Sequence, residues 1–142
     1  MPFEDKRKPR SLILAPFSPP GRRIRETLDR ALEEIGIEVF KFEDIGPGAQ
    51  LAYAIQDAIK SADFVVADIT NQNANVLYEL GAVHALRKPA ILIASETSND
   101  GIPPTLQGFF VIVYDPTDLN ALAKRVQTAA LRLADEAAQK YA

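Results

Sequence analysis

The sequence predicts a three-layer α/β fold built on a five-stranded parallel sheet in the order 2-1-3-4-5, the flavodoxin-like form of the Rossmannoid architecture. Short apolar runs alternate along the chain with stretches that repeat apolar residues at helical spacing. This alternation implies right-handed crossovers and a parallel sheet. The run at 63–69 is apolar almost throughout, as a strand covered by helices on both faces must be. A chain of 142 residues suits one such domain.

The strands are predicted from apolar runs of strand length between turn or capping residues. They are SLILAP (11–16), IEVFKF (37–42), DFVVADI (63–69), PAILIAS (89–95) and FFVIVY (109–114). The segment between the last two runs reads as a loop with room for one short turn. No internal repeat interrupts the pattern, so we expect a single domain over 11–142 after a flexible tail at 1–10.

Capping residues and periodicity predict the helices. Ser18 can cap the first helix, prolines are tolerated in a first turn, and Gly36 ends the helix. Asp115 or Thr117 can cap the last one. The apolar positions at helical spacing are Ile24, Leu28, Ala31, Leu32 and Ile35, then Leu51, Ile55, Ala58 and Ile59, then Val76, Leu80, Val83 and Leu86, and finally Leu119, Leu122, Val126, Ala130, Leu133 and Ala137.

The composition excludes several functional classes. A net charge of -3 lacks the basic excess of a dedicated nucleic-acid-binding domain. No cysteine and one histidine leave too few ligands for a zinc site and no thiolate chemistry. No apolar run reaches the roughly 18 residues of a membrane helix, and the first residues lack the apolar segment of a secretory signal. We therefore expect a cytoplasmic protein without a metal or other cofactor and without a membrane partner.

Ligands of such sheets bind beyond the carboxyl ends of the strands, at the point where the strand order reverses. This rule selects two loops, at 16–21 and 68–75, and predicts that Phe17 and Asp68 face one crevice. Asp68 ends the third strand, where it either caps the following turn or contacts a ligand. The amides and the hydroxyl after it either satisfy loop backbone or bind a small ligand; they belong to Thr70, Asn71, Asn73 and Asn75.

Glu79 lies inside the apolar stripe of the third helix, between Val83 and Leu86 in projection. Burying a carboxylate is costly, so its position needs a reason. In or near the first helical turn, the helix dipole would stabilise the anion by about 0.3–1 kcal/mol. The alternative is a carboxylate in a crevice, serving as a nucleophile or as an acceptor for ribose hydroxyls. We favour this functional interpretation.

Other polar residues point to function less strongly. His84 faces the same apolar stripe and is typical of a core histidine. Arg22, Arg23 and Arg25 open the first helix, where they form an exposed cluster or bind phosphate. Neither the glycine-rich dinucleotide fingerprint nor a P-loop is present. Any apolar strip of the last helix that the sheet leaves uncovered would serve a homodimer.

The segments LAPFSPP, ADFVVADIT and NANVLYELGAVHALRKPAILI together resemble bacterial nucleotide-binding proteins with a TIR-like domain. They are also similar to the related nucleoside 2-deoxyribosyltransferase superfamily, and weaker similarity extends the match over most of 11–115. In deoxyribosyltransferases and nucleotide N-glycosidases, the glutamate of the ELG segment attacks the anomeric carbon. TIR-family NAD hydrolases use a glutamate in a comparable role. The resemblance implies this role for Glu79.

Two positions depart from that pattern. Deoxyribosyltransferases carry an aspartate six residues before the glutamate and a glycine four residues before it, where this chain has Asn73 and Asn75. An amide cannot exchange a proton as an acid or base does. Asp68 is the residue that would take over this task.

Together these residues predict cleavage or transfer at the N-glycosidic bond of a nucleoside, a nucleotide or NAD. Glu79 would be the nucleophile or would stabilise the oxocarbenium-like state. Phe17 would stack on the base, and Asp68 and Asn75 would hold sugar hydroxyls, with Ser18, Thr70 and Asn73 completing the substrate site. The alternative is a non-catalytic TIR-like module that binds a nucleotide and signals by association. Both allow a homodimer or a higher homo-oligomer.

Overall fold

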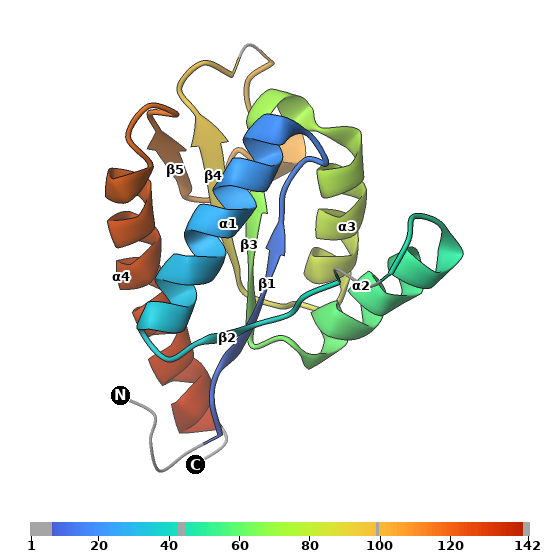
Figure 1. Cartoon of the computed structure of the whole chain (residues 1–142), viewed down its shortest axis with the longest axis vertical. Helices are drawn as coiled ribbons and strands as arrows, with labels where there is room; N and C mark the ends of the chain where they lie inside the picture. The colour runs from blue at the N-terminus through green and yellow to red at the C-terminus, as the bar shows by residue number, and fades with distance from the viewer. Residues whose placement is uncertain (1–6, 43–44, 99, 141–142) are drawn as a thin grey trace.

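The computed structural model describes residues 7–42, 45–98 and 100–140, which form a five-stranded sheet with helices on both faces (Figure 1). The strands are all parallel and lie in the order β2-β1-β3-β4-β5, which confirms the predicted topology. In chain order the elements are β1 (Arg10–Leu14), α1 (Pro19–Glu34), β2 (Glu38–Val39), α2 (Ala49–Ser61), β3 (Phe64–Asp68), a 3-10 turn (Thr70–Gln72), α3 (Ala74–Ala85), β4 (Ala90–Ser95), a second 3-10 turn (Pro104–Leu106), β5 (Val111–Tyr114) and α4 (Leu119–Lys140).

The three layers follow from the alternation of side chains along the strands. Ile13 packs with α1 and α4 on one face of the sheet, whereas Leu12 and Leu14 pack with α2 and α3 on the other. Figure 1 shows the two helix pairs on the two sides of the sheet. Every residue of β3 is buried, as its uninterrupted apolar sequence predicts.

Local signals set the helix boundaries. The Ser18 hydroxyl accepts a hydrogen bond from the Gly21 amide at 3.2 Å and caps α1, and Gly36 follows the helix with a φ of 85°. Asn73 caps α3 in the same way, through the amide of Val76 at 3.1 Å. Since α3 begins at Ala74, Glu79 lies in its second turn. Glu79 is therefore near the first turn rather than in it, where the helix dipole stabilises an anion less because that effect fades beyond the first turn.

The edge strand β2 is shorter than its sequence predicts. Its two residues pair with Arg10 and Ser11 of β1, and the Phe40 amide donates one more bond to the Ser11 carbonyl at 3.0 Å. The apolar run 37–42 then leaves the sheet. The carbonyl groups of Ile13 and Ala15, which point the same way as that of Ser11, consequently have no β2 partner.

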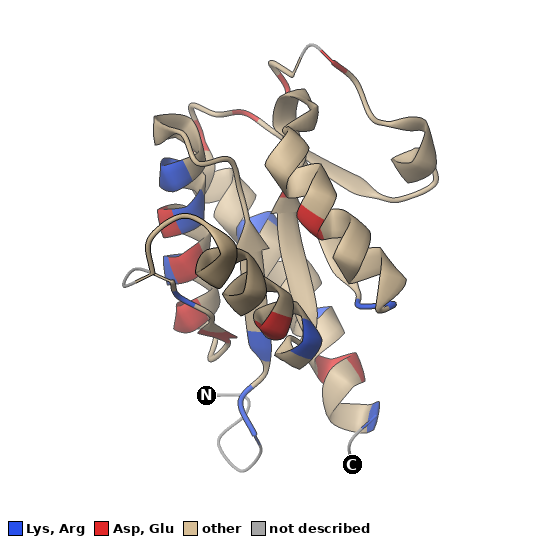
Figure 2. Cartoon of the chain, turned by 90° about the vertical axis from the view of Figure 1, so that its right-hand side faces the viewer, with Lys and Arg blue, Asp and Glu red and all other residues tan. Residues whose placement is uncertain are grey.

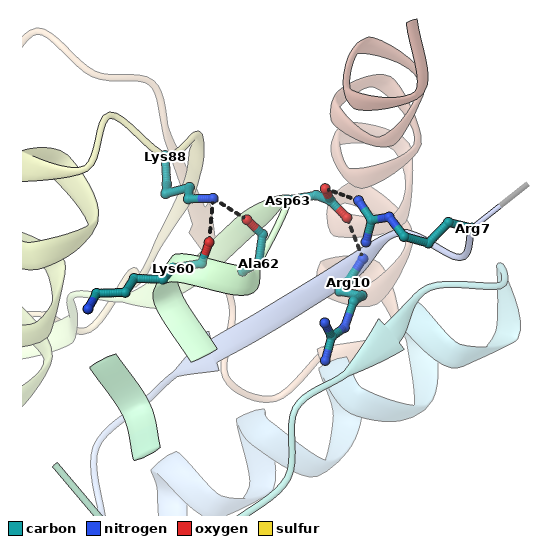
Figure 3. Close-up of polar contacts among 6 residues, drawn as sticks. All are labelled: Arg7, Arg10, Lys60, Ala62, Asp63 and Lys88. Carbon is teal, nitrogen blue, oxygen red and sulfur yellow. Dashed lines mark hydrogen bonds and ion pairs between the residues drawn. The ribbon is translucent and has the colours of Figure 1, made fainter. Parts of the chain in front are cut away.

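At the amino-terminal edge of the sheet, residues expected in the flexible tail have defined contacts (Figure 3). Arg7 forms an ion pair with Asp63 at 2.8 Å, and the amide of Arg10 donates to the other oxygen of that carboxylate at 2.8 Å. Nearby, the Lys88 ammonium donates to two carbonyl groups at the end of α2. The rest of the predicted tail, 1–6, lies outside the described residues.

The apolar stripe of α4 faces the sheet, with Leu122, Val126, Ala130 and Ala134 buried. Large exposed apolar side chains of the described residues lie elsewhere, so α4 does not offer the apolar strip that a dimer would need. These side chains are Phe17, Tyr53, Tyr78, Leu86, Ile102, Phe109, Phe110 and Val113. Within the described ranges, none of the helices combines the length and the apolar character needed to span a membrane.

Candidate functional site

Two of the hollows that Phe17 lines also reach residues at the carboxyl ends of the strands. The larger, called the cleft here, has a volume of about 590 Å³ and lies among Phe17, Asp68, Thr70 and Asn75. The smaller, called the Glu79 cavity, measures about 240 Å³ and is lined by Phe17 and Glu79 together with apolar residues of β1, α2 and the chain after β2. Phe17 and Asp68 therefore face one crevice, as predicted, whereas Glu79 lines the neighbouring one.

The loop from β1 to α1 presents Phe17 to both of these hollows. The ring is 65% exposed, although the residues around it are tightly held. A Cβ on Gly21 would lie 1.9 Å from the carbonyl oxygen of Pro16, so only glycine lets α1 start this close to the loop. Pro19 and Pro20 have no amide hydrogen, and Ser18 accepts the Gly21 amide. This helix start consequently presents few free donors to a phosphate.

Asp68, the last residue of β3, is 3% exposed, and both oxygens of its carboxylate accept hydrogen bonds. One oxygen accepts the Thr70 amide at 3.1 Å and its hydroxyl at 2.5 Å, and the other accepts the Tyr114 hydroxyl at 2.9 Å. The Thr70 hydroxyl in turn accepts the Ser95 amide at 2.9 Å. Burial, reinforced by the charge of Asp68, raises the pKa of the Tyr114 phenol, which therefore remains a donor. The network ties the ends of β3, β4 and β5 together.

The loop after Asp68 is shaped by side chain to backbone bonds. Asn71 and Gln72 have φ values of 54° and 47°, a left-handed conformation that asparagine tolerates better than most residues. The Asn71 amide donates to the Ser98 hydroxyl at 2.9 Å, and the Gln72 side chain donates to the carbonyl of Asp100 at 2.5 Å. Asn75 is exposed beside the cleft, in the first turn of α3. Its exposed side chain is therefore the best placed of the predicted polar residues to bind a ligand in the cleft.

Glu79 is half-buried on α3, beside the buried Val76, Leu80 and Val83. Within the described part of the chain, no residue donates a hydrogen bond to its carboxylate, in contrast to Asp68. Burial raises the pKa of the Glu79 carboxyl, and the positive charge of Arg25 opposes this rise. The same side chain also lines a groove of about 330 Å³ between α2 and α3.

Charged residues are distributed unevenly around this carboxylate. The sequence of α2 contains Asp57 and Lys60, and that of α3 contains Glu79 as its one acidic residue. Figure 2 shows these two helices with few charged positions, beside a helix that carries both signs in close succession. Within the Glu79 cavity, the other charged side chains among the described residues are Arg25, Asp29 and Lys41.

Most residues predicted from the sequence lie together in this candidate site, which also includes two residues that were not predicted individually. The cleft brings together six of the predicted ones, namely Phe17, Ser18, Asp68, Thr70, Asn73 and Asn75. Arg25 was predicted only as part of a cluster with Arg22 and Arg23, and Tyr114 was not singled out. The strand-end rule that selected Asp68 applies equally to Tyr114, the last residue of β5. His84 is half-buried and stacks on Phe109, with ring centroids 4.9 Å apart.

Comparisons with known proteins agree with this architecture. The TIR domain family matches residues 17–126, and no curated protein matches the sequence. The CMP N-glycosidase BcmB of Clostridium botulinum has a TM-score of 0.58 and 24% identity, covering 80% of this chain and 97% of that one. The 2-deoxyribosyltransferase of Bacillus psychrosaccharolyticus has a TM-score of 0.58 and 18% identity, covering 80% and 90%. The TIR domain of the Toll-related receptor TRR-2 of Hydra magnipapillata has a TM-score of 0.61 and 19% identity, covering 89% and 99%.

At these identities the likeness to the solved structures establishes the fold. The parallel sheet, its strand order and the hollows at its carboxyl edge define a flavodoxin-like α/β domain of the kind found in TIR domains and in nucleoside-processing enzymes. Because the family match spans residues 17–126, the chain belongs to the TIR domain family.

Proposed function

We propose that this domain cleaves or transfers the N-glycosidic bond of a nucleoside, a nucleotide or NAD, with Glu79 as the nucleophile. The observation that carries the proposal is the state of the Glu79 carboxylate. It is half-buried, accepts no hydrogen bond from a described residue, and lines the same cavity as the exposed ring of Phe17. A carboxylate held in this way has a use that offsets the cost of its burial.

In the proposed reaction, a Glu79 oxygen attacks the anomeric carbon as the bond to the base nitrogen breaks. The base leaves with the bonding electrons and takes a proton from solvent or from a bound water. The resulting glycosyl ester is then resolved by water, giving hydrolysis, or by a second base, giving transfer. Partial desolvation strengthens the attraction between the carboxylate and the positive charge that develops on the sugar.

The other residues take supporting roles in this proposal. Phe17 stacks on the base, and Asn75 meets sugar hydroxyls or phosphate from the cleft. The oxygen of the Asn73 side chain caps α3, which leaves its amino group for a ligand. Asp68 and Thr70 are bound to Tyr114 and to each other, so we assign them to holding the strand ends rather than to proton transfer or sugar binding.

The second candidate is a non-catalytic module that binds a nucleotide and signals by association. Asn73, which stands where deoxyribosyltransferases have an aspartate, favours it. The engagement of Asp68 by three donors favours it too, because within the described residues of the cleft no other carboxylate is placed to transfer a proton. The surface of α2 and α3 has few charged positions, and with Tyr53 64% and Tyr78 75% exposed it suits association.

Incubation with a panel of nucleosides, nucleotides and NAD, followed by chromatography for the released base, tests the proposal. Glu79→Gln keeps the shape of the side chain and removes its charge, so base release should fall by about a hundredfold or more with little change in binding by calorimetry. Glu136→Gln, on the exposed face of α4, is the matched control and should act as wild type. Undiminished activity of Glu79→Gln ends the catalytic role, and a wild type that binds nucleotide without releasing base identifies the sensor.

A further inference from the structure

Arg25 takes the place of the missing part of β2. Its guanidinium donates to the carbonyl of Ile13 at 2.9 Å and to that of Ala15 at 3.0 Å. The carbonyl before these two on this side of β1 is that of Ser11. It accepts a hydrogen bond from the Phe40 amide, and the chain then leaves the sheet. Buried carbonyl groups need donors, so Arg25 supplies the two bonds that a longer β2 would have made. The Glu79 cavity lies beside this gap, because β1 and the chain that follows β2 both line it.

The same guanidinium lies over the Phe17 ring and lines the cavity together with Glu79. Its central carbon lies 5.6 Å from the centroid of the Phe17 ring, within the range of a cation–π contact. Arg25, Phe17 and Glu79 all line the cavity, and Arg25 is the charged neighbour whose field acts on the Glu79 carboxylate. One side chain therefore binds the end of β1, lies over the ring beside the cleft and exerts its charge on the carboxylate on α3.

Other charged groups near Glu79 are directed elsewhere. Lys41, which follows β2, lies 2.9 Å from Glu33 and 3.8 Å from Asp29, so its charge is shared along α1. Asp29 is one turn beyond Arg25 on that helix. In the groove between α2 and α3, the described lining holds Tyr78 as the other ionisable side chain besides Glu79. Arg25 is thus the cation best placed to act on Glu79.

We propose that Arg25 is a positioning residue for the Glu79 reaction. Held by the carbonyls of Ile13 and Ala15, it fixes the loop that carries the Phe17 ring and places a permanent positive charge beside the nucleophile. The role rests on the proposed function of Glu79. Arginine suits both tasks because its planar guanidinium can donate to two carbonyls and face an aromatic ring together, whereas lysine cannot reproduce this geometry.

The two tasks are separated by two substitutions. Arg25→Met removes the charge, so the titration of the Glu79 carboxyl, followed by its ¹³C shift in the ligand-free protein, should move to higher pH. The acid limb of the pH profile for kcat/KM should move with it. Arg25→Lys keeps the charge and loses the paired bonds, so the acid limb should stay while KM rises about fivefold, the equivalent of one hydrogen bond. Arg30→Met, exposed on the same helix, should change neither quantity.

An unchanged Glu79 titration in Arg25→Met overturns the electrostatic role, and an unchanged KM in Arg25→Lys overturns the positioning of Phe17. If Arg25→Met does not fold, Arg25→Lys still decides through its KM. Failure of the proposed function has a different signature, since the wild type then releases no base from any member of the panel. In that case the ¹³C titration and the nucleotide affinity of Arg25→Lys, measured by calorimetry, decide the role of Arg25 at a binding site.

Discussion

Two carboxylates on neighbouring elements of this domain have opposite surroundings. Asp68 is 3% exposed and accepts three hydrogen bonds from Thr70 and Tyr114, whereas Glu79 is half-buried and accepts none from the described residues. The oxygens of the Asp68 carboxylate are engaged in hydrogen bonds that hold the ends of three strands together. The Glu79 carboxylate is left available beside a cavity. A carboxylate at the end of a central strand is therefore not by itself a functional group, since its partners decide whether it is available for chemistry.

The difference arises from the strands around each residue. At Asp68 the sheet is complete, and β4 and β5 bring Ser95 and Tyr114 into the network. Near Glu79 the sheet is incomplete, because β2 ends after two residues and leaves a cavity rather than a partner. Substitutions at the two sites should consequently separate stability from activity.

The largest expected effect on stability is at Asp68. Asp68→Ala leaves the Tyr114 hydroxyl and the Thr70 donors without their buried acceptor, and the free energy of unfolding should fall by about 3 kcal/mol. Glu79→Ala removes no hydrogen bond and should change it by less than about 1 kcal/mol. Urea denaturation of the two variants measures both. Similar losses at the two positions would refute the contrast drawn here.

A smaller loss is expected at the partner of Asp68. Tyr114→Phe removes one donor to a buried carboxylate and should lower the free energy of unfolding by about 1.5–3 kcal/mol. Tyr78→Phe, at a side chain that is 75% exposed, is the control and should have an effect within about 0.5 kcal/mol. Equal melting temperatures for Tyr114→Phe and wild type would show that the network does not hold the strand ends.

The smallest expected change in the free energy of unfolding is at Glu79, and it is a gain rather than a loss. Burial raises the folded-state pKa of Glu79 above its unfolded value, so the stability that this group contributes is complete below the unfolded pKa and is lost as the pH rises through the folded pKa. Glu79→Gln escapes this loss. It should therefore be more stable than wild type at neutral pH by less than about 1 kcal/mol, given the partial exposure of the group.

Below about pH 4, near the ordinary pKa of glutamate, this difference should disappear because wild-type Glu79 is then also neutral. Thermal melts of both proteins across this pH range make the comparison. A Glu79→Gln variant that is less stable at pH 7 would mean that the charge of Glu79 supports the fold.

Much of the fold was predictable because its signals are local. Ser18 and Gly36 delimit α1 through capping and a left-handed backbone, and the alternation of apolar runs with helical stretches gives the strand order. The length of β2 was not predictable in this way. The run 37–42 has the apolar residues of a strand, and its early departure from the sheet depends on contacts with distant parts of the chain.

The candidate site was predictable in its members and less so in its arrangement. The strand-end rule brought Phe17 and Asp68 into one cleft. It did not separate Glu79 into a cavity of its own, since that separation follows from the short β2. The partners of Arg25 are backbone carbonyls, which no residue pattern reveals. Whether a carboxylate such as Asp68 is engaged or available is likewise a property of the tertiary structure.

The contact of Gly21 with Pro16 also bears on how this domain tolerates mutation over evolutionary time. Any side chain at position 21 would meet the Pro16 carbonyl, so replacements there are removed by selection for folding, whatever the domain does. Four residues earlier, Phe17 is 65% exposed, so packing places little constraint on its side chain. Conservation of an aromatic ring at position 17 would therefore indicate selection for a function, whereas conservation of glycine at position 21 would indicate selection for the backbone that presents the ring.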